Sequence, residues 1–186
     1  MCYINMRRFI LLFSFSAFVV RAQEVSNFNQ HRLNYDKKFM LTLGTWATAN
    51  LVGGGIGWAT ATSHEIRSFH QMNTMWNTVN LALALPGYFK AKKEIPTDNL
   101  QLSLRQQQKT EQSFLFNSGL DFAYITAGLL LRSIALHQQS KSAQWRGFGN
   151  GLVVQGSFLL AFDLTAYTLH HRHGKKLFEW VKWGLR

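Results

Sequence analysis

Cysteine is almost absent from this chain of 186 residues. The one cysteine, Cys2, precedes the apolar run of residues 9–20, and none follows that run. If the run belongs to a signal sequence that is removed, the mature chain has no thiol. Disulfides, thiolate catalysis and iron–sulfur ligation are then excluded.

Acidic residues are also scarce: 9 Asp and Glu stand against 20 Lys and Arg, and the formal net charge is +11. We expect this excess to lie beside the anionic headgroups of a lipid bilayer. Nucleic-acid binding would need a soluble module with a basic face and stacking aromatic residues, and no soluble stretch is long enough for one. The sequence therefore predicts the bilayer, and no nucleic acid, as a partner.

The motifs of the common enzyme classes are missing. There is no G-x-S-x-G, no phosphate-binding loop and no dinucleotide fingerprint. His64-Glu65 lacks the second histidine of the metalloprotease signature. The histidines within residues 170–173 have no acidic or thiol ligand beside them, and nearby Lys175 would repel a cation. We predict no metal, no cofactor and no catalytic residues.

Charged residues are missing from two long stretches and nearly missing from two more. Each stretch is near the ~20 residues that a helix needs to cross a bilayer. The mean hydropathy of the whole chain is only -0.09, because the stretches also contain Thr, Asn, Gln, Gly and His. Membrane helices tolerate such residues where they face other helices or a cavity. We predict an all-α fold, a four-helix transmembrane bundle made of two antiparallel hairpins. The stretches are residues 39–62, 69–89, 114–136 and 147–169, and their only charged residues are Asp121, Arg132 and Asp163.

Residues 1–22 have the pattern of a secretory signal peptide. Arg7 and Arg8 precede the apolar run, and the small or medium-sized residues up to Ala22 suit a signal peptidase. Cleavage after Ala22 would leave residues 23–38 as an extracytoplasmic segment. We therefore expect a multi-pass protein of a bacterial inner membrane.

The segments between and after the stretches carry most of the charge. Residues 90–112 form a polar linker, in which Pro96 marks a break and residues 100–112 can continue as helix into the third stretch. The tail, residues 170–186, mixes Lys and Arg with Phe and Trp, which is typical of a segment at the bilayer interface. The signal peptide puts linker and tail outside the cytoplasm, whereas their positive charge predicts the reverse. The sequence leaves the orientation open.

In each stretch, polar or small residues recur at helical spacing, so they share one face of the predicted helix. Two glycines of the first stretch, four residues apart, are expected to let a neighbouring helix approach closely. The polar side chains are expected to face inward, either as a pocket or hydrated pathway or as hydrogen-bonded contacts between helices. The glycines are Gly53 and Gly57, and the polar candidates are His70, Asn73, Asn77, Asn80, Asn117, Asp121, Tyr124, Asp163 and Tyr167.

Three motifs stand out in the last three stretches. They are F-H-Q-M-N-x-x-W-N-x-V-N at residues 69–80, N-S-G-L-D-x-x-Y at residues 117–124 and Q-G-S-F-L-L-x-F-D at residues 155–163. Together they resemble an uncharacterised family of small membrane proteins from Gram-negative bacteria. The resemblance implies a signal peptide followed by four spans, and it implies no activity.

The sequence favours a non-catalytic structural, accessory or ligand-binding membrane component. The main alternative is a transporter for a small solute, or an ion- or proton-coupled transporter, built from the two hairpins. A membrane-embedded haem protein or enzyme is a further alternative, for which His70 and His137 would be the haem ligands. The sequence also leaves open whether the protein forms a homo-oligomer or binds a membrane partner.

Overall fold

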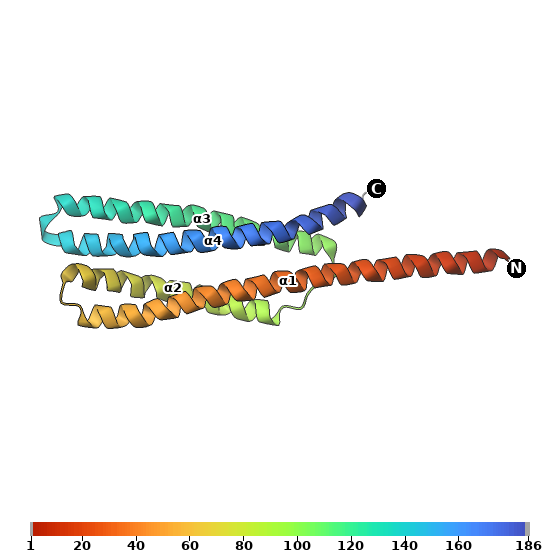
Figure 1. Cartoon of the computed structure of the whole chain (residues 1–186), viewed down its shortest axis with the longest axis horizontal. Coiled ribbons are helices and arrows are strands. Elements are labelled where there is room, and N and C mark those ends of the chain that lie inside the picture. The colour runs from red at the N-terminus through yellow and green to blue at the C-terminus, as the bar shows by residue number, and fades with distance from the viewer. Residues whose placement is uncertain (1, 185–186) are drawn as a thin grey trace.

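The computed structural model describes the backbone of residues 2–184 and the side chains of residues 21–182. Within this part, the chain forms four long helices and one 3-10 turn, and it has no strand. The helices run alternately in opposite directions as two hairpins, α1 with α2 and α3 with α4 (Figure 1). The prediction of an all-α, four-helix protein is confirmed. The elements are α1 (Cys2–Thr60), α2 (His64–Lys93), α3 (Leu100–His137), η1 (Gln139–Lys141) and α4 (Ser142–Gly184).

Each helix is longer than the charge-poor stretch that it contains. α1 has 59 residues and runs without a break through Ala22 and residues 23–38. The predicted signal peptide falls mostly on residues whose side chains lie outside the described ones, so its removal stays a prediction. α3 begins at Leu100, as the sequence suggested for the second half of the linker. α4 continues through the predicted tail as far as Gly184.

The connection between the two hairpins follows from local chemistry. α2 ends before Glu94, whose backbone is extended. Ile95 precedes Pro96, and the residue before a proline is disfavoured from the helical conformation. Asn99 then caps α3, because its side-chain oxygen accepts a hydrogen bond from the Leu102 amide at 2.9 Å. A short non-helical segment therefore suffices to join the hairpins.

Glycines bring helices together at two of the interfaces that α4 makes. Between α3 and α4, a Cβ added to Gly128 would lie 2.7 Å from the carbonyl oxygen of Gly149. Between α2 and α4, a Cβ added to Gly147 would collide with the carbonyl oxygen of Glu65. The backbones approach this closely because no side chain separates them.

The interface between α1 and α2 also contains glycines, but with a different spacing from the predicted one. Gly57 lies against the ring of His70. Gly53 is exposed, with nothing within 4 Å of the position that its Cβ would take, whereas Gly54 is buried next to Thr74. Gly53 thus takes no part in this contact. The face of α1 that meets α2 carries glycines three residues apart rather than four, and both spacings lie on one helical face.

No close backbone approach joins α2 and α3 anywhere in the described chain. An apolar cluster contributed by all four helices lies between them instead, and part of it forms the floor of a groove. The cluster consists of Leu43, Ala84, Phe114, Leu159, Phe162 and Ala166.

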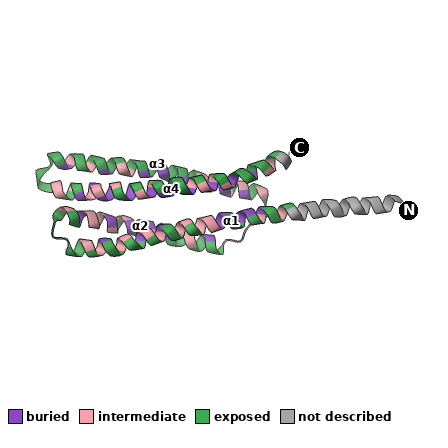
Figure 2. Ribbon diagram, viewed as in Figure 1, coloured by how far each residue is buried: buried purple, intermediate pink, exposed green. Residues whose placement is uncertain are grey.

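The interior of the bundle is rich in polar side chains, and its outside is rich in apolar ones. Asn77, Gln155 and His170 are fully buried. Leu83 and Phe122, by contrast, are 62% and 66% exposed. Figure 2 shows exposed residues along the outer faces of all four helices. This distribution is the reverse of the one found in most water-soluble bundles.

Two segments of the described chain are long and apolar enough to cross a bilayer. They are residues 100–137 and 139–182, each with a mean hydropathy of 1.4 in its most apolar window. Helices in the cores of soluble proteins also pass this test, so it supports membrane insertion only weakly. α1 and α2 do not pass it over their described residues, and four membrane spans are not supported by hydropathy alone.

Candidate functional site

Two adjoining cavities lie in the groove between α2 and α3. The inner cavity has a volume of about 330 Å³, and the outer cavity has a volume of about 350 Å³. Both are lined by Met40, Phe114 and Asn117, so they form one continuous groove. Volumes of this size are common for sites that bind small molecules.

The inner cavity holds two acidic side chains between apolar walls. Asp121 of α3 and Asp163 of α4 are only 2% and 5% exposed, and their carboxyl groups lie beside each other. Oδ2 of Asp121 has no hydrogen-bond partner among the described residues. An unpaired buried acceptor is costly, and the neighbouring carboxyl group of Asp163 can satisfy this oxygen by sharing a proton with it. The apolar walls include Trp76, Val79, Leu83 and Leu120.

The asparagines of α2 have different roles. Oδ1 of Asn73 accepts a hydrogen bond from Nε2 of Gln155 at 2.9 Å, and Nε1 of Trp46 donates to Oε1 of Gln155 at 3.0 Å. These bonds link α1, α2 and α4. Asn80 lines the inner cavity, and its Nδ2 donates to Oδ1 of Asn77 at 3.1 Å. Asn73 therefore holds helices together, whereas Asn77 orients a side chain of the groove.

The remaining predicted residues lie at different places along the bundle. Tyr124 lines the inner cavity and meets Trp76 edge-on, with ring centroids 4.7 Å apart. Asn117 lies where the two cavities join. Tyr167 stacks on His171, with ring centroids 5.6 Å apart, and does not line the groove. The groove thus gathers Asn80, Asn117, Asp121, Tyr124 and Asp163, while His70, Asn73, Asn77 and Tyr167 lie outside it.

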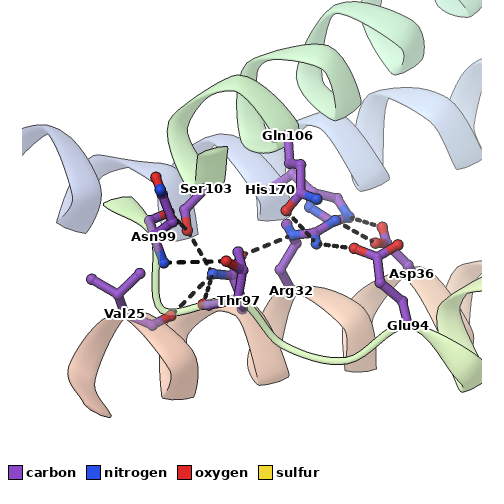
Figure 3. Close-up of polar contacts among 10 residues, drawn as sticks. Val25, Arg32, Asp36, Glu94, Thr97, Asn99, Ser103, Gln106 and His170 are labelled. Atoms are coloured by element: carbon purple, nitrogen blue, oxygen red, sulfur yellow. Dashed lines mark hydrogen bonds and ion pairs between the residues drawn. The ribbon is translucent and has the colours of Figure 1, made fainter. Parts of the chain in front are cut away.

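A second group of polar residues, the polar end cluster, lies at the outer end of the groove, where four of its members line the outer cavity. Figure 3 shows the polar contacts within this cluster. Its centre is Arg32 of α1, which is 5% exposed. Nη2 of Arg32 donates to Oε1 of Glu94 at 2.8 Å and to Oε1 of Gln106 at 3.1 Å, and Nη1 lies 3.3 Å from Oδ2 of Asp36. One guanidinium therefore connects α1, the end of α2 and α3. The cluster consists of Asn29, Arg32, Asp36, Glu94, Thr97, Ser103, Gln106 and His170.

Asn29 extends the polar end cluster to the connection between the hairpins. It is fully buried, and its Nδ2 donates to the carbonyl oxygen of Thr97 at 2.8 Å and to Oγ of Ser103 at 2.6 Å. The connection is thus fastened to α1 by side-chain bonds, and the two hairpins cannot separate at this end without breaking them.

His170 brings α4 into the polar end cluster. Its ring is fully buried, and Nε2 lies 3.3 Å from Oδ1 of Asp36. The ring stacks on Phe114, with centroids 5.5 Å apart, and the rings of Tyr35 and Phe39 lie within 6 Å. Nε2 of Gln107 donates to the backbone carbonyl of His170 at 2.7 Å. Neither ring nitrogen of His170 has a hydrogen-bond partner among the described residues, so the imidazole is held in place by its aromatic neighbours and by the bond to its backbone carbonyl.

His173 fastens the tail of α4 to α1. Its ring stacks on Phe28, with centroids 4.0 Å apart, and Nε2 lies 3.0 Å from the Phe28 carbonyl oxygen. Burial lowers the pKa of His173, because desolvation disfavours the imidazolium, although the bond to the carbonyl opposes this shift. Trp180 also contacts Phe28 edge-on. The tail, predicted to lie at the bilayer interface, is therefore packed against residues 21–38 of α1.

The polar end cluster was not predicted from the sequence. From the sequence alone, Arg32, Asp36 and Glu94 had no separate role. The four-residue spacing of Arg32 and Asp36 was a usable signal, since such pairs meet on one helical face. The approach of Glu94 and His170 had no signal in the sequence. No group of three or more metal-ligating side chains occurs in the part of the chain that the structure describes.

One family model matches residues 42–164 of the chain, about two thirds of its length. The chain belongs to this family of unknown function (DUF6992). The DUF6992 region contains all three motifs noted in the sequence and both groove acids. It excludes Arg32, Asp36 and His170 of the polar end cluster. No curated protein and no solved structure matches the chain.

Proposed function

We propose that this protein is a multi-pass membrane protein that binds a small ligand in the groove between α2 and α3. The observation that carries the proposal is the pair Asp121 and Asp163, buried side by side in a cavity with apolar walls. Acidic residues within membrane helices are costly and are usually kept for a function.

The exposed apolar side chains support a membrane location. On α1 they run from Leu41 to Trp58, which is about 26 Å at 1.5 Å per residue. This length is close to the ~30 Å thickness of the hydrocarbon core of a bilayer. Large exposed apolar surfaces are rare on soluble proteins. We infer that all four helices cross the membrane, in keeping with a bacterial inner-membrane protein.

The polar character of α2 does not argue against this location. Its mean hydropathy is lowered by Asn73, Asn77 and Asn80, which are buried and would not meet lipid. Its exposed positions include Met75 and Val79, which are 55% and 58% exposed. A membrane helix needs an apolar outer face, and a polar inner face costs little where its hydrogen bonds are made within the bundle.

The same acid pair supports a second candidate, proton- or ion-coupled transport. Two neighbouring carboxyl groups can hold one proton between them, and acidic residues form proton relays in membrane pumps. Proton flux through liposomes containing the protein would favour transport if it were abolished in Asp121→Asn and retained in Asp98→Asn, which makes the same change at an exposed position outside both cavities. Absence of flux would leave binding as the function.

The proposed function can be tested by filling the inner cavity of the groove with a larger side chain. Leu120→Trp enlarges a side chain of the inner cavity, and Leu115→Trp makes the same change at an exposed position of α3 outside both cavities. Small molecules extracted from the detergent-purified protein are measured by mass spectrometry. We expect a bound species whose amount falls about tenfold in Leu120→Trp, equivalent to ~1.4 kcal/mol, and is unchanged in Leu115→Trp. Equal amounts in the two variants would contradict a ligand site in the groove.

A further inference from the structure

From the charges at the outer end of the groove, we propose that its ligand is a phospholipid with an anionic headgroup, taken from the surrounding bilayer. The inference rests on the proposed function and names the class of ligand. The headgroup would lie in the outer cavity and one acyl chain in the inner cavity.

Two lysines supply the charge for this headgroup. Lys90 of α2 and Lys109 of α3 both line the outer cavity, from opposite sides of the groove. Both are exposed, and neither forms an ion pair with a described side chain. Arg32, in contrast, is already engaged with Asp36 and Glu94. The two free ammonium groups are thus the ones available to a phosphate.

All charges of the outer cavity must be considered together. Its basic residues are Arg32, Lys90 and Lys109, and its acidic residues are Asp36 and Glu94, which leaves one net positive charge. Because both acids are bound to Arg32, the positive charge is concentrated at the lysines on the rim. Thr110 and Ser113 add hydroxyl groups between Lys109 and the inner cavity. An anion is favoured at the rim and a cation is not.

The lysines also lie at the depth where headgroups are found. Lys90 directly follows Phe89, the last exposed large apolar residue of α2, and Lys109 lies one to two helical turns before the apolar run that opens with Phe114. Lysine at this boundary meets the phosphates of anionic lipids, an attraction of about 1 kcal/mol for each basic residue. The depth of the two lysines and their positive charge therefore both suit the headgroup of an anionic lipid.

The inner cavity has the shape and surface for an acyl chain. From Lys109 to Asp121 the groove extends over about 18 Å along α3, at 1.5 Å per residue. This is close to the thickness of one leaflet, about half of a ~30 Å hydrocarbon core. Val79 and Leu83 on the rim are more than half exposed, so a chain could enter sideways from the bilayer. A water-soluble ligand would not need such an opening.

The experiment compares two lipids that have the same acyl chains but headgroups of different net charge. Detergent-purified protein is mixed with equal amounts of phosphatidylglycerol and phosphatidylcholine of identical chains, and bound lipid is measured by native mass spectrometry. We expect about tenfold more phosphatidylglycerol than phosphatidylcholine on the unmodified protein. Lys90→Gln with Lys109→Gln should remove this preference. Lys92→Gln with Lys93→Gln, which removes the same charge from exposed residues outside the groove, should retain it.

Each outcome distinguishes this inference from the proposed function. Equal binding of the two lipids, or an equal loss of preference in both double variants, would overturn the anionic-lipid inference. If Leu120→Trp still lowered the binding of both lipids, the groove would remain a ligand site. If Leu120→Trp left both unchanged, the inference and the proposed function would fall together. Unchanged thermal unfolding of the lysine variants would show that they remain folded.

Discussion

Replacing Arg32 with methionine is expected to lower the free energy of unfolding by about 3 kcal/mol. The guanidinium is buried and has four side-chain partners, namely Asn29, Asp36, Glu94 and Gln106. Its removal leaves two carboxylates with no cation in a partly buried setting, and breaking a buried ion pair from one side costs ~3–5 kcal/mol. The lower end of this range applies, because Asp36 and Glu94 are 20% and 25% exposed. Thermal and denaturant unfolding in detergent would measure the change.

The control for this prediction is a second ion pair in the same molecule. Arg146 and Glu65 lie 3.1 Å apart, and their side chains are 46% and 35% exposed. Arg146→Met should cost less than about 1 kcal/mol, because exposed ion pairs contribute little. Adding Glu94→Gln to Arg32→Met should restore part of the lost stability, since one unpaired charge disappears. If the two methionine variants were equally stable, the polar end cluster would not hold the hairpins together.

Replacing Gly128 with alanine is expected to destabilise the protein by about 2 kcal/mol. The added Cβ would lie 2.7 Å from the carbonyl oxygen of Gly149 and 2.9 Å from a methyl carbon of Val153. The oxygen belongs to the backbone of α4, which cannot rotate away as a side chain can. The two helices would have to separate, and overpacking of this kind costs ~1–3 kcal/mol.

Gly119 provides the matched control on the same helix. Nothing lies within 4 Å of the position that its Cβ would take. Gly119→Ala should therefore stabilise the protein by up to ~1 kcal/mol, because alanine favours a helix over glycine. Both substitutions replace glycine with alanine, but the changes in stability that they cause should have opposite signs. A destabilisation of the same size at both positions would show that α3 and α4 do not meet at Gly128.

The inward position of the groove acids could be predicted because helical spacing determines it. Asp121 follows Asn117 by four residues, so both lie on one side of α3, and apolar residues cover the other sides. A costly carboxylate would then face the interior. The meeting of Asp121 with Asp163 follows once α3 and α4 form a hairpin. The sequence could not tell which inward residues line a cavity, since that depends on the gap between α2 and α3.

Helix rotation explains the misplaced glycine contact. Residues 53–55 are three consecutive glycines, and each successive residue turns the helix by about 100°. Spacing alone suits Gly53 and Gly57 as well as Gly54 and Gly57. The choice depends on how α1 is rotated about its axis, and the neighbouring Thr74 and His70 of α2 decide it. Helical periodicity identifies the buried face of a helix only when the residues on that face differ in kind from those on the neighbouring faces.

The polar end cluster was beyond sequence reasoning for another reason. Its members come from three helices and from the connection at residues 94–99, and they meet only after the hairpins pack. From the sequence, the excess of positive charge was expected to lie beside the headgroups of a bilayer. The helical continuity of α1 through residues 23–38 is what allows Arg32 to reach Glu94. α1 is continuous across residue 39, so the start of the charge-poor stretch does not coincide with the start of a helix.

The central claim is that the exposed apolar faces of all four helices meet lipid, including those of α1 and α2. Spin labels on single cysteines, in a Cys2→Ser background and in lipid nanodiscs, test it by collision with oxygen and with a water-soluble nickel chelate. Val52 of α1 and Met75 of α2 are 60% and 55% exposed, and Gln108 is an exposed polar position near the start of α3. Labels at Val52 and Met75 should collide more with oxygen, and the label at Gln108 more with nickel. Labels at Val52 and Met75 that collide more with nickel than with oxygen would contradict the membrane bundle.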